Sequence, residues 1–148
     1  MKKLDLPPFE YKIKRENNGT KIFDIIRRKY IVLTPEEWVR QHFVHYLIDQ
    51  LHYPRTLINI ESGLKYNQLR KRSDIVVYDK SGSSFLLVEC KSATSQISKN
   101  AIFQAATYNH SIKAKYVAIT NGLSFVCCKV SGDSEQLTWV ENLPTFME

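Results

Sequence analysis

The sequence predicts one mixed α/β domain with a central sheet flanked by helices. Apolar stretches of strand length alternate with two stretches of helical periodicity, and Asn-Gly pairs mark hairpin turns. Hydrophobic residues make up 43% of the 148 residues, which suits the core of one ordinary domain. We therefore expect a single domain over 1–148, with an N-terminal hairpin (9–33), a core (34–130) and a short tail (131–148).

The N-terminal part of the chain predicts a β-hairpin followed by a helix. Two alternating runs in FEYKIKRENNGTKIFDIIRRKYIVL flank Asn17-Asn18-Gly19, which is a hairpin signal. In TPEEWVRQHFVHYLIDQLHYP, Thr34 suits the N-cap position, and Glu37 completes a capping box with it. Apolar residues at helical spacing predict that this helix continues to about His52.

The middle and the end of the chain predict three strands, a second helix and two more strands. The three strands are LINIESGLKYN and the pair SDIVVYD and SFLLVECKSA, which a turn over 79–84 joins. Ser98 can cap a helix over SKNAIFQAATYNHSIK, and KYVAITNG and LSFVCCKV meet at Asn121-Gly122. The tail, QLTWVENLPTF, adds a short edge strand, so the complete order is typical of a mixed sheet covered by helices.

Charge, cysteine content and hydropathy indicate what kind of partner and which compartment the protein has. The net charge of +6 is compatible with a polyanionic partner, and one basic cluster, Lys65, Arg70, Lys71 and Arg72, is a candidate nucleic-acid contact. The three cysteines are an odd number, which argues against a disulfide framework and fits a reducing cytosol. No apolar run approaches the roughly 20 residues that cross a bilayer. We therefore expect a cytoplasmic protein that does not enter a membrane.

Charged residues interrupt the two apolar strands of SDIVVYDKSGSSFLLVECKSA. If a hairpin pairs these strands through the turn over 79–84, Asp74 lies opposite Glu89. Glu89 and Lys91 are two residues apart and therefore share a face. Opposed carboxylates are stable together when a divalent cation lies between them, and oxygen ligands suit Mg²⁺ or Mn²⁺. Lys91 can position or help deprotonate an attacking water, so the set predicts metal-assisted phosphodiester hydrolysis.

The first helix adds a carboxylate to this set. Glu36 falls in the middle of the apolar arc of that helix, and Glu37 falls at its margin. Glu37 already has a local role in the capping box, so we favour Glu36 as the carboxylate that faces the site, with Glu37 as the alternative. Both also have a simpler explanation, because acidic residues stabilise a helix N-terminus.

The second helix contributes Gln104 and Tyr108. Residues four apart share a helix face, so Gln104 can bond a phosphate or a metal-bound water with Tyr108 beside it.

Taken together, these residues resemble the PD-(D/E)XK nuclease superfamily. S-D74…E89-C-K91 resembles its signature, and Q104-A-A-T-Y108 resembles the QxxxY motif of its exonuclease-like branch. The wider string LTPEEWVRQHF…LHYPRTLINIESGLKYN…KRSDIVVYD…LLVECKSA…YVAITNG resembles the N-terminal nuclease domain of type I restriction enzyme R subunits, in a stand-alone form. The likeness covers about two thirds of the chain.

This resemblance implies a restriction-endonuclease-like fold with the core order α-β-β-β-α-β. It implies that Asp74, Glu89 and the backbone carbonyl of Cys90 bind the metal, and that Lys91 activates water. Gln104, Tyr108 and Glu36 would support the site. The sequence departs from R subunits because it lacks the G-x-x-x-x-G-K-[ST] loop of their motor. A motor or specificity function would therefore need separate subunits, and a homodimer is equally compatible.

Two other interpretations remain open. One is a nucleic-acid-binding or assembly module that keeps the fold without cutting DNA. The other is a scaffold domain in which Glu89 and Lys91 form a simple ion pair at a strand end.

Overall fold

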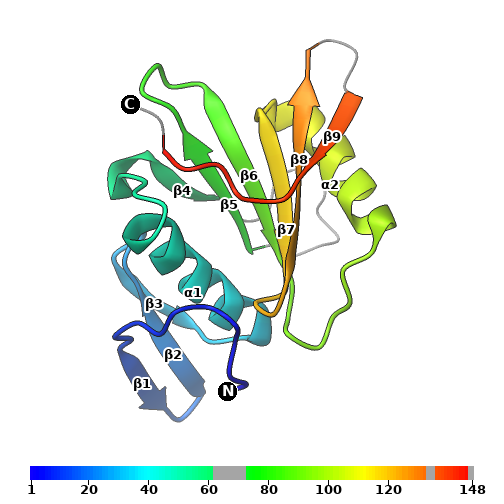
Figure 1. Ribbon diagram of the computed structural model, residues 1–148. Helices are drawn as coiled ribbons and strands as arrows, with labels where there is room; N and C mark the ends of the chain where they lie inside the picture. Colours follow the sequence, from blue (N-terminus) through cyan, green and yellow to red (C-terminus); the bar gives the residue numbers. More distant parts are fainter. Residues whose placement is uncertain (62–72, 133–135, 147–148) are drawn as a thin grey trace.

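Two sheets and two helices make up the computed structural model, which describes residues 1–61, 73–132 and 136–146 (Figure 1). A three-stranded antiparallel sheet precedes the first helix, and a six-stranded mixed sheet forms the body of the molecule. The expectation of a mixed α/β protein is therefore confirmed. None of the helices in these ranges is long and apolar enough to span a membrane.

The N-terminal sheet contains three strands, where the sequence predicted a two-stranded hairpin. The strands are β1 (Ile13–Glu16), β2 (Gly19–Asp24) and β3 (Lys29–Val32), in the order β1-β2-β3. A second turn divides the run that the prediction treated as one strand. Asp24 Oδ1 accepts hydrogen bonds from the backbone amides of Ile26 and Arg27, at 2.8 and 2.9 Å, and Arg28 adopts a left-handed conformation with φ 57°.

Helix α1 (Pro35–Asp49) begins as predicted. The Thr34 hydroxyl accepts a hydrogen bond from the amide of Glu37 at 3.0 Å, and Pro35 occupies the first turn. The helix ends at Asp49, three residues before the predicted end at His52, which has a left-handed φ of 63°. A short 3₁₀ turn, Arg55–Leu57, then leads into the main sheet.

The main sheet has the strand order β4-β5-β6-β7-β8-β9. Its strands are β4 (Ile58–Glu61), β5 (Ser73–Tyr78), β6 (Ser84–Cys90), β7 (Tyr116–Thr120), β8 (Phe125–Ser131) and β9 (Gln136–Val140). Neighbouring strands are antiparallel except β6 and β7, which are parallel and joined by helix α2 (Lys99–Ile112). The tail forms the predicted edge strand, β9, beside β8.

The two helices cover opposite faces of this sheet (Figure 1). On the α1 face, Phe43 and Leu47 pack with Ile75, Val88 and Ala118. On the α2 face, a second cluster joins the helix to β7 and β8; its buried members are Ala101, Ile102, Ala105, Val117, Ile119 and Cys128. Because both faces are covered, the strand sequences are continuous apolar runs. A charged residue within such a strand departs from this pattern.

Candidate active site

The strands β5 and β6 pair in the register that the sequence predicted. Asp74 lies opposite Glu89, Ile75 opposite Val88, and the antiparallel pairing continues to Val77. A register shift follows Val77, so Tyr78 pairs with Ser84. The backbone therefore brings the positions of the two predicted metal ligands directly opposite each other.

Glu89 is a buried acid at the end of an apolar strand. It is 5% exposed, and its Oε2 lies 2.9 Å from the ammonium nitrogen of Lys91, whose side chain is 28% exposed. A buried carboxylate is unfavourable unless a cation or hydrogen bonds balance it, and Lys91 supplies that balance here. The prediction that the two side chains share a face is confirmed.

Strand alternation assigns this acidic position to the α2 face of the sheet. Leu87 and Val76 pack with Ala114 just beyond the end of α2, whereas Val88 belongs to the core under α1. Glu89 alternates with Val88 and so belongs with Leu87. By register, position 74 belongs to the same face as Val76.

A third acidic position, Glu61, lies in the same row, and sequence reasoning missed it. Glu61 on β4 pairs with Asp74, which pairs with Glu89, so three adjacent strands each present an acidic position at one level. The side chains of Glu61 and Asp74 lie outside the part of the chain that the structure describes. The sequence LINIE contains a signal that could have found it. Ile58 and Ile60 both face the core, so Glu61, next along the strand, belongs to the opposite face.

The chain after β6 is fixed to the neighbouring strand. The amide of Lys91 donates to the Thr120 carbonyl at 2.8 Å. The Asn121 side chain donates to the Ser95 carbonyl at 2.8 Å. The Ser92 hydroxyl is 3.1 Å from that of Ser95. These bonds anchor the segment that follows β6 beside the end of β7.

The sequence predicted two support residues on α2, Gln104 and Tyr108. Gln104 is exposed on this helix, and the side chain of Tyr108 lies outside the described residues. The basic cluster Lys65, Arg70, Lys71 and Arg72 also lies outside them. Among the side chains that the structure describes, which do not include those of Glu61 and Asp74, no group of three or more His, Cys, Asp or Glu could hold a metal ion.

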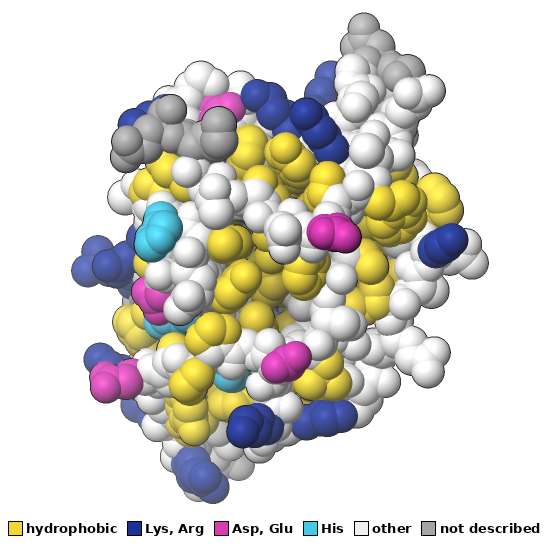
Figure 2. Space-filling model, in the orientation of Figure 1, with side chains coloured by type: hydrophobic (Ala, Val, Ile, Leu, Met, Phe, Trp, Pro, Cys, Tyr) yellow, Lys and Arg dark blue, Asp and Glu magenta, His cyan; other side chains and the backbone are white. Residues whose placement is uncertain are grey.

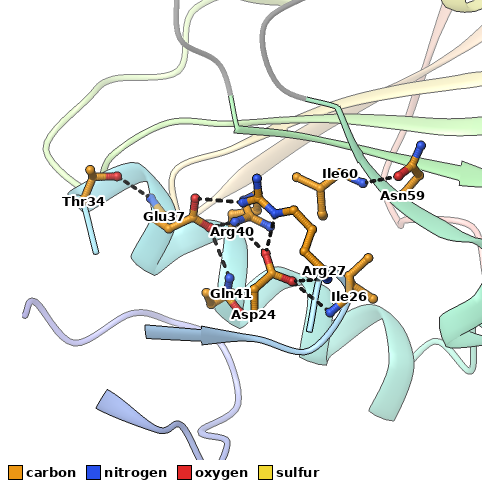
Figure 3. Close-up of polar contacts among 9 residues, drawn as sticks. All are labelled: Asp24, Ile26, Arg27, Thr34, Glu37, Arg40, Gln41, Asn59 and Ile60. Atoms are coloured by element: carbon orange, nitrogen blue, oxygen red, sulfur yellow. Dashed lines mark hydrogen bonds and ion pairs between the residues drawn. The ribbon is translucent and has the colours of Figure 1, made fainter. Parts of the chain in front are cut away.

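The orientation predicted for the acidic residues of α1 is wrong. Glu36 is exposed, whereas Glu37 is 7% exposed and points inward to Arg40 and to Gln41, whose Nε2 donates to it at 3.2 Å (Figure 3). The reason is Arg40, one turn later, which is fully buried and attracts the carboxylate of Glu37. Glu37 therefore serves a buried ion-pair network as well as the capping box.

That network joins α1 to the N-terminal sheet. Arg40 Nη2 lies 3.1 Å from Asp24 Oδ2 on β2, and Arg27 Nε lies 3.0 Å from the same oxygen (Figure 3). Burial alone would raise the pKa of Asp24, but the hydrogen bonds from Arg27 and the charge of Arg40 outweigh it and lower the pKa. Burial lowers the pKa of Arg40 to about 10, so both groups are charged at neutral pH.

A pocket of about 370 Å³ lies on the other side of the main sheet, beside α1. Its lining includes Phe43 and Tyr46 from the helix, and Thr120 and Phe125 from β7 and β8. Neither Glu89 nor Lys91 is among the described residues that line it. The Glu89–Lys91 ion pair therefore does not form part of the wall of this pocket that the structure describes.

A protein-family model matches most of the chain. The family model described as type I restriction enzyme R protein N terminus (HSDR_N) matches residues 35–144, from the first turn of α1 to just beyond β9. The match covers well over half of the chain and includes all the positions in the acidic row. No curated protein and no solved structure matches the chain.

Proposed function

Because the chain belongs to the family of type I restriction enzyme R protein N-termini, we propose that it is a metal-dependent nuclease domain that hydrolyses DNA phosphodiester bonds. Membership supports a function related to restriction and modification. The observation that carries the finer proposal is the backbone register that sets Asp74 opposite Glu89, with Lys91 2.9 Å from Glu89. Hard oxygen donors beside a lysine fit Mg²⁺ or Mn²⁺ better than any softer metal.

In this proposal Asp74, Glu89 and the carbonyl of Cys90 hold the cation. When bound, it supplies positive charge for the phosphate and lowers the pKa of a water molecule. Glu89 is suited to this role because its carboxylate is buried at a strand end, where few water molecules compete for it. The paired strands fix the backbone positions of Asp74 and Glu89 relative to each other, which a preorganised site requires.

Lys91 has two tasks in the proposed reaction. Its ammonium balances Glu89 while no cation is present. With a cation in the site, the ammonium would hydrogen-bond the attacking water or stabilise the negative charge that develops on the phosphate. Its partial exposure leaves it accessible to substrate.

Gln104 and Tyr108 have supporting roles in this proposal. Gln104 is exposed on α2, the helix that covers the face of the acidic row, so it can contact DNA that lies over the site. Lys65, Arg70, Lys71 and Arg72 are proposed phosphate contacts. The proposal also includes a restriction-endonuclease-like fold, a cytoplasmic location and cooperation with a second copy or with separate motor and specificity subunits.

Cleavage of plasmid DNA by the purified protein in Mg²⁺ or Mn²⁺ tests the proposal. Glu89→Gln and Lys91→Ala should each abolish metal-dependent cleavage. Lys115→Ala should not, because this exposed lysine just precedes β7, at the other end of the strand from the position beside Glu89. Equal cleavage by the wild type and both site variants would show that a contaminant is responsible. Absence of cleavage in every protein would favour the second function below.

The second candidate function is a DNA-binding or assembly module that does not cut. The observation that favours it is the Glu89–Lys91 ion pair, which neutralises the buried acid without any metal. Mg²⁺ titration separates the two, because a cation that binds only the folded protein raises its Tm. A rise in Tm that Glu89→Gln removes supports the nuclease, and an unchanged Tm supports the module.

A further inference from the structure

The N-terminal sheet carries most of the net charge of the protein. Residues 1–32 contain nine Lys and Arg against four Asp and Glu, a net charge of +5 out of +6 for the whole chain. Figure 2 shows Lys and Arg side chains along the lower rim of the molecule, where this sheet lies. A concentration of positive charge of this kind attracts a polyanion.

The sheet has one buried face and one open face. Ile22 and Asp24 are buried and face α1, Ile22 in the core and Asp24 against Arg40. Their neighbours on β2, Lys21 and Phe23, therefore belong to the open face. By register, the open face also contains Lys14 on β1 and Tyr30 and Val32 on β3.

Aromatic rings and lysines alternate on this open face. The rings of Phe23 and Tyr30 lie edge to face, with their centroids 5.3 Å apart. The Lys12 ammonium lies 5.6 Å from the Phe23 ring centroid, and the Lys14 ammonium lies 4.7 Å from that of Tyr30. Val32 is 61% exposed beside them.

Glu16 is the acidic residue among the strand positions of this face. It alternates with Lys14 along β1 and forms an ion pair with Lys21 at 3.4 Å. The ammonium groups of Lys12 and Lys14 instead lie against aromatic rings. An exposed contact of this kind contributes little free energy, so a phosphate can replace the ring as their partner.

We propose that this open face binds single-stranded nucleic acid. Lysines that track a phosphate backbone, set among aromatic rings on which bases stack, are the two parts of a single-strand platform. A duplex offers the phosphates but keeps its bases stacked inside, so the rings favour a single strand. When a strand binds, its phosphates pair with the ammonium groups of Lys12 and Lys14, which leave the Phe23 and Tyr30 rings. Bases then stack on the ring faces that the lysines have left.

This surface adds to the proposed nuclease function without depending on it. All its residues precede residue 35, so they lie outside the part of the chain that matches the family. Binding requires no metal and no cleavage. An assay in EDTA therefore tests the surface even if the nuclease proposal fails.

Fluorescence anisotropy of labelled 20-nucleotide oligo(dT), oligo(U) and a matched DNA duplex, in EDTA, tests the proposal. The wild type should bind the single strands more tightly than the duplex, and the two single-stranded arms distinguish DNA from RNA. Phe23→Leu should weaken single-strand binding at least about fivefold. Lys12→Gln with Lys14→Gln should reduce the slope of log K against log salt by about 1.4, since each phosphate contact on a single strand contributes about 0.7.

A matched control removes the same charge elsewhere. The control variant combines Lys80→Gln, in the turn between β5 and β6, with Lys129→Gln on β8. These elements lie across the molecule from the N-terminal sheet (Figure 1). Lys80 also lies over a ring, with its ammonium 6.0 Å from the Phe146 centroid. This control should leave the salt slope unchanged. Val32→Asp adds a negative charge at an exposed position without removing a ring, and should weaken binding if Phe23→Leu proves unstable.

Three results would overturn the proposal. The first is equal affinity for the single strands and the duplex. The second is equal loss of binding in the Lys12/Lys14 and Lys80/Lys129 variants. The third is unchanged binding in folded Phe23→Leu and Val32→Asp, with folding checked by circular dichroism.

Discussion

Replacing Arg40 by Met tests whether the buried network holds the N-terminal sheet on α1. Arg40 is fully buried, and its loss leaves Asp24, at 1% exposure, without one of its two cationic partners. Breaking a buried ion pair typically destabilises a protein by about 3–5 kcal/mol. Two features reduce this figure: Arg27 still contacts Asp24 at 3.0 Å, and the Nε and Nη1 atoms of Arg40 are buried without hydrogen-bond partners. We expect a loss of roughly 2–3 kcal/mol at pH 7, or roughly 6–9 °C in Tm.

The loss should depend on pH with a defined sign. The folded-state pKa of Asp24 is lowered, so its ionisation stabilises the protein above the unfolded pKa and this contribution disappears as pH falls through the folded pKa. Arg40→Met removes one cause of the lowered pKa. The difference in stability between wild type and variant should therefore shrink as the pH is lowered from 7 into the acid range.

Urea denaturation of a double-mutant cycle measures the effect. Asp24→Asn removes the charge but keeps an oxygen for the amides of Ile26 and Arg27. The double variant should be at least about 1 kcal/mol more stable than the sum of the single effects predicts, because Arg40 and Asp24 interact directly. Two results would refute the claim that the Arg40–Asp24 pair holds the N-terminal sheet on α1. One is strict additivity of the two substitutions, and the other is a loss of stability below about 1 kcal/mol in Arg40→Met.

Three further predictions concern single sites. Glu37→Gln should lower the Tm by several degrees and Glu36→Gln by less than about 2 °C, since only Glu37 is buried; thermal melts of both variants decide this. Burial raises the pKa of Cys127 to about 12 and the other two cysteines are also buried, so none of the three should react with a thiol reagent at pH 8 until the protein is denatured. Gly122→Ala should destabilise the protein by about 1 kcal/mol or more in urea, because φ is +84° and the new Cβ would lie 2.8 Å from Leu4.

The pairing of the acidic positions was predictable because local chemistry fixes it. Asp79 Oδ1 accepts from the amides of Ser81 and Ser83 at 3.0 Å, and Gly82 supplies a left-handed φ of 86°. Such a turn sets where two apolar strands begin to pair. The register shift next to Tyr78 was not predictable, yet it did not displace position 74 from Glu89, since the pairing beyond it is regular.

The inward side of α1 was not predictable from hydrophobicity. An arc drawn through the apolar residues of the helix predicts that Glu36 faces inward and does not predict that Arg40 is in the core. In the fold Arg40 is fully buried because its partner, Asp24, lies on a strand of another sheet. The same cause hid the third strand of the N-terminal sheet, because the turn that separates β2 from β3 depends on the side chain of Asp24.

The region that matches the family packs against residues that precede it. Leu4 and Ile22, both before residue 35, belong to the same buried cluster as Phe43 and Val88. The amide of Asp5 also donates to the Gly122 carbonyl at 2.8 Å, next to the end of β7. A protein cut back to 35–144 would therefore expose Arg40 and one side of the core, and its failure to cleave DNA would report unfolding. Tests of the acidic row accordingly need the whole chain, with point substitutions such as Glu89→Gln in place of deletions.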